Sequence, residues 1–121
     1  TLIYSTGLPP ASVAAASAAI DLILGDPGYA ARPLQKTRMF TKALGLTPAA
    51  SPIVPIILGS TERTLEASRL LQDEGFLVIA IRPPTVPDGK ARLRVTFTAG
   101  HDDADIARLV DIVKTRILDQ V

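Results

Sequence analysis

The sequence predicts an α+β fold, with two N-terminal helices followed by a β-α-β-β-α domain. Its small, mostly antiparallel sheet is expected to be covered on one face by helices. Residues 11–44 contain two helical stretches, separated by Gly25-Asp26-Pro27-Gly28. Residues 92–98 alternate polar and apolar side chains, which is typical of a strand with one buried face. Residues 103–118 carry apolar side chains at helical spacing, which predicts a final amphipathic helix.

The N-terminal part of the chain is predicted to be helical. Two prolines suit the first turn of a helix over residues 11–24. Because that helix is apolar on every side, we expect it to be buried on every side. A second, amphipathic helix is predicted over residues 29–44, with Gly45 as its C-cap. We therefore assign residues 1–48 to an interdomain helical segment with an N-terminal loop, and residues 49–121 to a C-terminal α+β small domain.

The rest of the chain combines strands and helices. Apolar and β-branched residues predict strands over 53–58 and 76–81, with a helix over 60–74 between them. Prolines make residues 82–89 a stiff loop. In the strand over 92–98 we expect Leu93, Val95 and Phe97 to face the helices. The outward face of that strand is then free to meet another domain.

Composition and charge argue against several functional classes. The 121 residues are 47% hydrophobic and 21% charged, with a net charge of +1, which suits one compact domain and indicates neither a nucleic-acid nor a membrane partner. Without cysteine, thiolate chemistry is excluded and a cytoplasmic location is the default. His101 is the only histidine, so a histidine metal cluster is impossible. Because the chain begins with Thr1 inside an apolar run, we expect it to be part of a longer protein.

Arg82 and Arg94 are the candidate binding residues. A planar guanidinium can hold a carboxylate or a phosphate through two parallel hydrogen bonds. Pro83 and Pro84 restrict the loop that carries Arg82, and Arg94 projects from the outward face of a strand. The alternative is that both are solvated surface arginines, one of them beside a proline turn.

Two hydroxyl groups are further candidates. Thr85 could donate to a ligand, or it could satisfy the backbone of its own turn. Thr6, just before Gly7, could donate to a phosphate or cap the first helix. On the residues alone, both alternatives stay open. Asp102 and Asp103 lie at a helix start, where acids are ordinary capping residues, and we expect a structural role for them.

Several segments, in this order and spacing, resemble the α-oxoamine synthase family, which consists of pyridoxal-phosphate (PLP) enzymes of fold type I. The resemblance extends over essentially the whole chain. The proline loop favours the alanine-using members of the family over the glycine-using ones. The matching segments are Tyr4-Ser5-Thr6-Gly7-Leu8-Pro9-Pro10, Ala80-Ile81-Arg82-Pro83-Pro84-Thr85-Val86-Pro87, Gly89, Ala91-Arg92-Leu93-Arg94-Val95-Thr96-Phe97-Thr98-Ala99 and His101.

The resemblance implies that the parent protein is a PLP-dependent acyltransferase. Such an enzyme condenses L-alanine with a pimeloyl thioester, of CoA or a carrier protein, and releases CO2 to give 8-amino-7-oxononanoate for biotin biosynthesis. PLP supplies the electron sink, and the parent is expected to be a homodimer with sites at the subunit interface. The alternatives are a sibling synthase that uses glycine or serine, and a non-catalytic α+β ligand-binding module.

The resemblance also implies roles for individual residues. Arg94 matches the arginine that pairs with the amino-acid carboxylate, and Arg82 matches one that engages this carboxylate as the acyl substrate arrives. Thr85 matches a loop residue close to the substrate, and Thr6 matches the hydroxyl that reaches the PLP phosphate of the neighbouring subunit. His101 is expected to be structural. No lysine matches the one that binds PLP covalently, so we expect no catalytic residue and poor PLP binding in this chain alone; the four lysines are Lys36, Lys42, Lys90 and Lys114.

Overall fold

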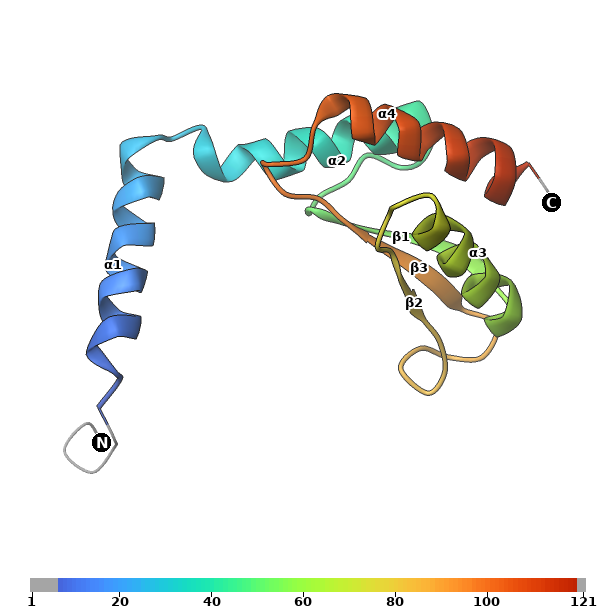
Figure 1. Ribbon diagram of the computed structural model, residues 1–121, viewed down its shortest axis with the longest axis horizontal. Helices are drawn as coiled ribbons and strands as arrows, with labels where there is room; N and C mark the ends of the chain where they lie inside the picture. Colours follow the sequence, from blue (N-terminus) through green and yellow to red (C-terminus); the bar gives the residue numbers. More distant parts are fainter. Residues whose placement is uncertain (1–6, 120–121) are drawn as a thin grey trace. The chain divides into compact units, whose positions relative to one another are not determined.

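The computed structural model describes residues 7–119, which belong to two compact units that divide between Ala31 and Arg32 (Figure 1). The first unit contains helix α1 (Pro10–Gly25) and a short 3-10 turn, η1 (Tyr29–Ala31). Helix α1 begins with proline at its first position, where the missing N–H costs no hydrogen bond. After the helix, the N–H of Gly28 donates to Oδ1 of Asp26 at 3.0 Å and forms a turn.

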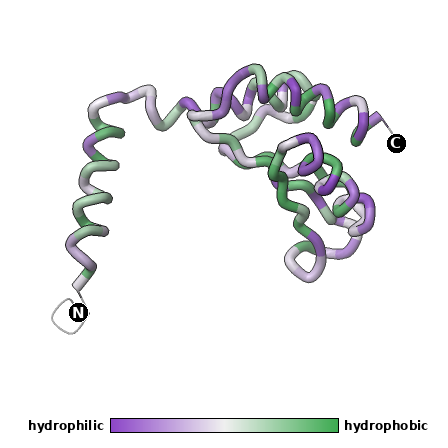
Figure 2. The backbone as a smooth tube through the Cα atoms, viewed as in Figure 1, coloured by the Kyte–Doolittle hydropathy of each residue, from purple (hydrophilic) through white to green (hydrophobic). Residues whose placement is uncertain are grey.

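Helix α1 differs from the prediction in its burial. None of its residues is buried, although most of them are apolar (Figure 2). Leu22 and Leu24 are 61% and 74% exposed. The predicted burial is therefore wrong for this structure, because a helix buries apolar surface only where another element covers it, and the first unit has no such element in its described residues.

The second unit is built on a three-stranded sheet in the order β1-β3-β2. Its strands are β1 (Ile53–Gly59), β2 (Ile79–Ile81) and β3 (Ala91–Thr96), and both neighbouring pairs are antiparallel. Arg94 of the central strand lies opposite Pro55 of β1 and opposite Ile79 of β2. The predicted small antiparallel sheet is thus confirmed.

Helices cover one face of this sheet, as predicted (Figure 1). They are α2 (Arg32–Ala43), α3 (Thr61–Asp73) and α4 (Asp103–Ile112), which continues as a π-helical stretch, η2 (Val113–Leu118). Lys36 on α2 forms an ion pair with Asp103 at the start of α4. The core between the helices and the sheet includes Phe40, Val54, Ile56, Leu71, Leu93, Val95, Phe97, Ile106, Leu109, Val113 and Ile117.

Strand β3 confirms the predicted alternation. Leu93, Val95 and Phe97 are buried toward the helices, whereas Arg94 and Thr96 are exposed on the opposite face. The period of two along a strand places successive side chains on opposite faces, so one row packs and the other remains outward.

Strand β2 is shorter than the predicted strand over residues 76–81. The N–H of Gly75, at a φ of 86°, donates to the carbonyl of Gln72, and the N–H of Phe76 donates to the carbonyl of Leu71 at 2.7 Å. These two bonds form a Schellman motif at the end of α3. Because Phe76 closes the helix, the chain pairs with β3 only from Ile79 onward.

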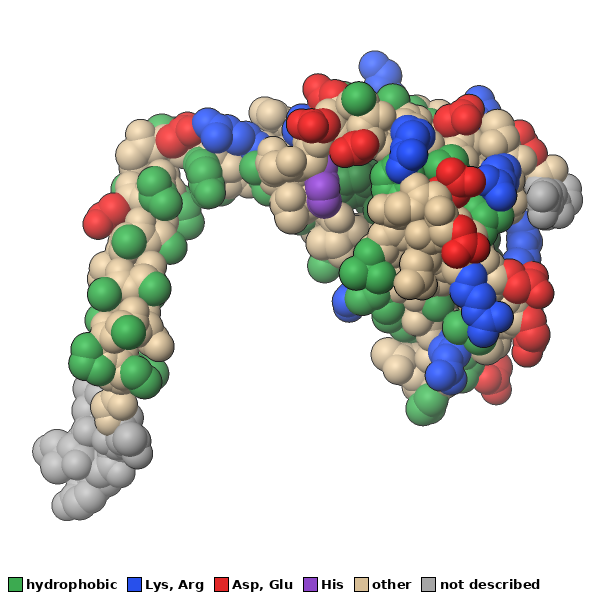
Figure 3. All heavy atoms as spheres, in the orientation of Figure 1, with side chains coloured by type: hydrophobic (Ala, Val, Ile, Leu, Met, Phe, Trp, Pro, Cys, Tyr) green, Lys and Arg blue, Asp and Glu red, His purple; other side chains and the backbone are tan. Residues whose placement is uncertain are grey.

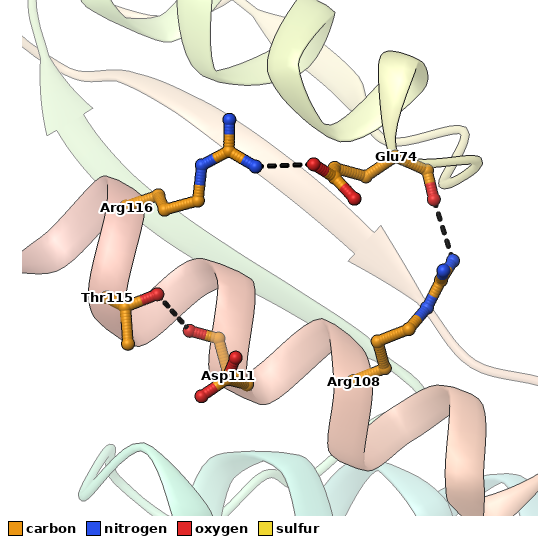
Figure 4. Close-up of polar contacts among 5 residues, drawn as sticks. All are labelled: Glu74, Arg108, Asp111, Thr115 and Arg116. Atoms are coloured by element: carbon orange, nitrogen blue, oxygen red, sulfur yellow. Dashed lines mark hydrogen bonds and ion pairs between the residues drawn. The ribbon is translucent and has the colours of Figure 1, made fainter.

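Two arginines hold the end of α3 against the last helix (Figure 4). The Nη2 of Arg108 donates to the main-chain carbonyl of Glu74 at 2.7 Å, and its guanidinium lies 4.5 Å from the centre of the Phe76 ring. Arg116 forms an ion pair with the carboxylate of Glu74. These contacts join α3 to α4 and η2 and so set the point from which the chain enters β2.

No helix in the described part of the chain is both long enough and apolar enough to span a membrane.

Candidate functional site

Arg94 is mounted on the central strand of the sheet and points away from the core. Its neighbours across the ladders are Pro55 and Ile79. Among residues 7–119, no side chain forms a hydrogen bond or an ion pair with its guanidinium. All five N–H donors therefore remain available to a carboxylate or a phosphate.

The face that carries Arg94 is apolar apart from its central row. We call it the outward face, and it comprises Ile53, Pro55, Ile57, Ile79, Ile81, Arg92, Arg94 and Thr96. Ile53, Ile57 and Ile79 are each about half exposed. A cation with apolar neighbours interacts more strongly with an anion once water is excluded, because the local dielectric constant falls. The outward face thus suits recognition of a ligand that combines negative charge with an apolar part.

Charge elsewhere on the second unit is mixed. On the side of the molecule shown in Figure 3, its basic and acidic side chains are interspersed, whereas helix α1 of the first unit is mostly hydrophobic. Anion recognition by this chain would therefore depend on individual guanidinium groups rather than on a broad positive field.

Arg82 lies in the loop directly after β2. Its main-chain carbonyl accepts the N–H of Thr85 at 3.1 Å, which closes a turn around Pro83 and Pro84. Its side chain has no hydrogen bond within the described part of the chain. The β2 partner of Arg94 is Ile79, and Arg82 follows Ile79 by three residues. At the rise of an extended chain, this offset corresponds to about 10 Å along the direction of β2. Arg82 and Arg94 are therefore carried by different elements, the proline loop and the central strand.

Thr85 is exposed at the end of the same turn. Its main-chain N–H stabilises the turn, but its hydroxyl forms no hydrogen bond with residues 7–119. The turn is thus satisfied by the backbone, and the hydroxyl is left for another partner. Thr6, the fourth predicted site residue, lies outside the described residues.

His101 is held by the structure. Its Nδ1 accepts the N–H of Thr98 at 3.1 Å, and its ring lies edge-on to Phe97 with 6.1 Å between ring centres. It borders a cavity of about 290 Å³ whose lining also includes Asp105 and Arg108 but not Arg82 or Arg94. These contacts agree with the predicted structural role of His101.

The lysines in the described part of the chain are either exposed or ion-paired. Lys42, Lys90 and Lys114 are exposed, and Lys36 is paired with Asp103. No group of three or more histidine or acidic side chains among residues 7–119 could hold a metal ion. The described part of the chain therefore offers two guanidinium groups without a partner, those of Arg82 and Arg94, whereas its lysines are exposed or ion-paired.

Comparison with known proteins places these features in a family. The sequence model of "Aminotransferase class I and II" matches residues 1–113. A curated relative from Parvibaculum lavamentivorans, named "Putative 8-amino-7-oxononanoate synthase", is 66% identical over 118 residues. The match covers 98% of this chain and 30% of that relative. The chain thus spans about 30% of the length of curated relatives that it matches.

Solved structures agree with the fold. A high-resolution structure of SPT with PLP superposes with a TM-score of 0.72 at 27% identity, and the match covers 90% of this chain and 29% of that one. The 8-amino-7-oxononanoate synthase of Francisella tularensis superposes with a TM-score of 0.75 at 22% identity, and the match covers 97% of this chain and 36% of that one. At such identity the second likeness concerns the fold alone. The α+β arrangement is therefore that of one part of a larger PLP-enzyme fold.

Proposed function

Since the chain belongs to the aminotransferase class I and II family, we propose that it is the carboxylate-recognition part of a PLP-dependent acyltransferase. The parent protein would condense L-alanine with a pimeloyl thioester and release CO2, giving 8-amino-7-oxononanoate for biotin biosynthesis. The 66% identity to a relative that bears this product in its name supports the assignment. Within the chain, the proposal rests mainly on the setting of Arg94. Its guanidinium is unpaired among the described residues, and it lies on a strand between apolar neighbours.

Each predicted site residue has a role in this proposal. Arg94 binds the carboxylate of alanine in a bidentate manner and so fixes the orientation of the α-carbon. Arg82 approaches the same carboxylate from the proline loop when the acyl substrate arrives, and Thr85 offers its exposed hydroxyl beside it. Thr6 would contact the PLP phosphate in the neighbouring subunit of a homodimer.

The rest of the parent would hold the cofactor. PLP is proposed for the parent because a superposable structure carries it in its title, whereas the described lysines here are exposed or ion-paired. We further propose that residues 1–48 form an interdomain segment and residues 49–121 the small domain. A cytoplasmic location is proposed because the cysteine-free sequence suits a reducing compartment.

The test is a condensation assay on the purified full-length parent. L-alanine, glycine and L-serine are offered in parallel with pimeloyl-CoA, and the products are identified by mass spectrometry. We expect 8-amino-7-oxononanoate with alanine and much slower reactions with the other two. A preference for glycine or serine would replace the proposal with a sibling synthase. Absence of any condensation product would favour a ligand-binding module.

A further inference from the structure

Arg92 is a second cation on the outward face. It precedes Arg94 by two residues on β3, so the two side chains leave the same face of the strand about 7 Å apart. Arg92 lies between Ile57 and Ile81, just as Arg94 lies between Pro55 and Ile79. The outward face therefore presents two positive charges, each with apolar neighbours on both sides.

The side chain of Arg92 is oriented by one hydrogen bond. Its Nε donates to the main-chain carbonyl of Lys90 at 3.0 Å, and the residue is half-buried. Among residues 7–119, no acidic side chain pairs with its guanidinium. The terminal NH2 groups of Arg92 thus remain available, on a side chain that has already lost part of its conformational freedom.

The acyl substrate of the proposed reaction carries an anion at its far end, at a distance from the thioester that is similar to the spacing of Arg92 and Arg94. A pimeloyl group ends in a carboxylate, and five methylenes separate that carboxylate from the thioester carbon. With C–C bonds of about 1.5 Å, the extended chain spans roughly 8 Å. This length is close to the spacing of the two arginines along β3.

We propose that Arg92 determines acyl specificity by binding the distal carboxylate of the pimeloyl group. The inference rests on the proposed function and adds the recognition of its second substrate. Arg94 holds the carboxylate of the amino acid, the acyl chain lies along the isoleucines of the outward face, and Arg92 receives the far end. An acyl chain that ends in a methyl group would leave Arg92 desolvated and unpaired, which penalises its binding.

The experiment compares two CoA thioesters in the full-length parent. Pimeloyl-CoA carries the distal carboxylate, and heptanoyl-CoA has the same chain length but ends in a methyl group. Heptanoyl-CoA is measured as a competitive inhibitor, so that slow turnover does not obscure its affinity. We expect Arg92→Gln to raise the KM for pimeloyl-CoA by about 10- to 100-fold, as for loss of a charge-assisted hydrogen-bonded pair. The inhibition constant of heptanoyl-CoA and the KM for alanine should not rise.

Controls separate this role from a structural one. Arg69→Gln, an exposed change on α3, should leave both thioesters unaffected. Arg92→Lys retains the charge without the planar fork and should discriminate between the thioesters less than the wild type but more than Arg92→Gln. If Arg92→Gln does not fold, the same comparison with Arg92→Lys decides the question. Equal weakening of both thioesters, or no weakening of either, would overturn the inference. A wild-type parent that forms no condensation product would instead overturn the proposed function.

Discussion

Arg94 of β3 and Ile79 of β2 are direct partners across an antiparallel ladder, with their side chains on the outward face. The charge of Arg94 therefore has an aliphatic neighbour on this side instead of a carboxylate. On the other side its partner is Pro55, which also lacks charge. Within residues 7–119 the guanidinium has no partner to lose, so hydrogen bonds to a bound carboxylate would contribute directly to binding.

Arg94→Ala should weaken alanine binding in the full-length parent. Loss of charge-assisted hydrogen bonds is worth about 1.5–3 kcal/mol, so the KM for alanine should rise by about 10- to 100-fold. Steady-state kinetics with varied alanine at saturating pimeloyl-CoA measure the effect. Arg94→Lys should recover only part of the affinity, since an ammonium cannot form the bidentate pair. An unchanged KM for alanine in Arg94→Ala would disprove the carboxylate role.

Arg82→Ala should act mainly on turnover. Because Arg82 lies in the loop after β2 and is expected to engage when the acyl substrate arrives, kcat should fall by at least about tenfold. The KM for alanine should change much less than in Arg94→Ala. The two variants are compared in one assay, with alanine and pimeloyl-CoA varied separately. The idea of sequential roles would fail if Arg82→Ala raised the KM for alanine as much as Arg94→Ala did and left kcat unchanged.

Leu71→Ala should destabilise the 121-residue chain strongly. Leu71 is 0% exposed in the core under α3, and truncation of such a side chain costs about 2–5 kcal/mol of unfolding free energy. Leu77→Ala is the matched control, because Leu77 is 86% exposed and its truncation should change stability by less than about 0.5 kcal/mol. Urea unfolding followed by circular dichroism measures both. Similar midpoints for the two variants would contradict the packing described here.

The two contacts of Glu74 should differ in their contribution to stability. Arg108→Ala removes a hydrogen bond to the main-chain carbonyl of Glu74 and the stacking on Phe76, and should cost about 1–2 kcal/mol. Glu74→Gln removes only a partly exposed ion pair with Arg116, so it should cost less than about 1 kcal/mol.

Urea titrations of both Glu74-contact variants, run at low and high salt, test this difference. High salt should lower the unfolding free energy of the wild-type protein only slightly more than that of Glu74→Gln. The reason is that water already screens an exposed ion pair at low salt. A larger loss in Glu74→Gln than in Arg108→Ala would reverse the assignment.

Local sequence predicted most of the elements because their signals lie within a few residues. Alternation over residues 92–98 was sufficient to place Leu93 and Val95 inward, since side chains of a strand point to opposite faces whatever it pairs with. The strand over 76–81 was predicted too long because apolar composition does not reveal that Phe76 closes a helix. That closure depends on hydrogen bonds to Leu71 and Gln72 from residues beyond the helix end.

The candidate site was predictable in part. Arg82, Arg94 and Thr85 stand out in the sequence because prolines and strand alternation restrict how they are presented, although their roles remain proposals. Arg92 is not among the candidate binding residues predicted from the sequence, and the structure shows no acidic partner for it among residues 7–119. The signal that could have drawn attention to it is its position two residues before Arg94 on the same strand face.

The α+β class, the order of helices and strands, and the side of β3 that faces the core can all be predicted from the sequence alone. These properties follow from short-range periodicity and from the conformational limits of proline and glycine. The folded sheet is needed to place Arg94 between Pro55 and Ile79, and Arg92 between Ile57 and Ile81. Those neighbours are distant along the chain, and pairing register depends on how the whole sheet packs against its helices. The fold therefore creates the outward face, because strand pairing brings two cations next to aliphatic side chains that are distant in the sequence.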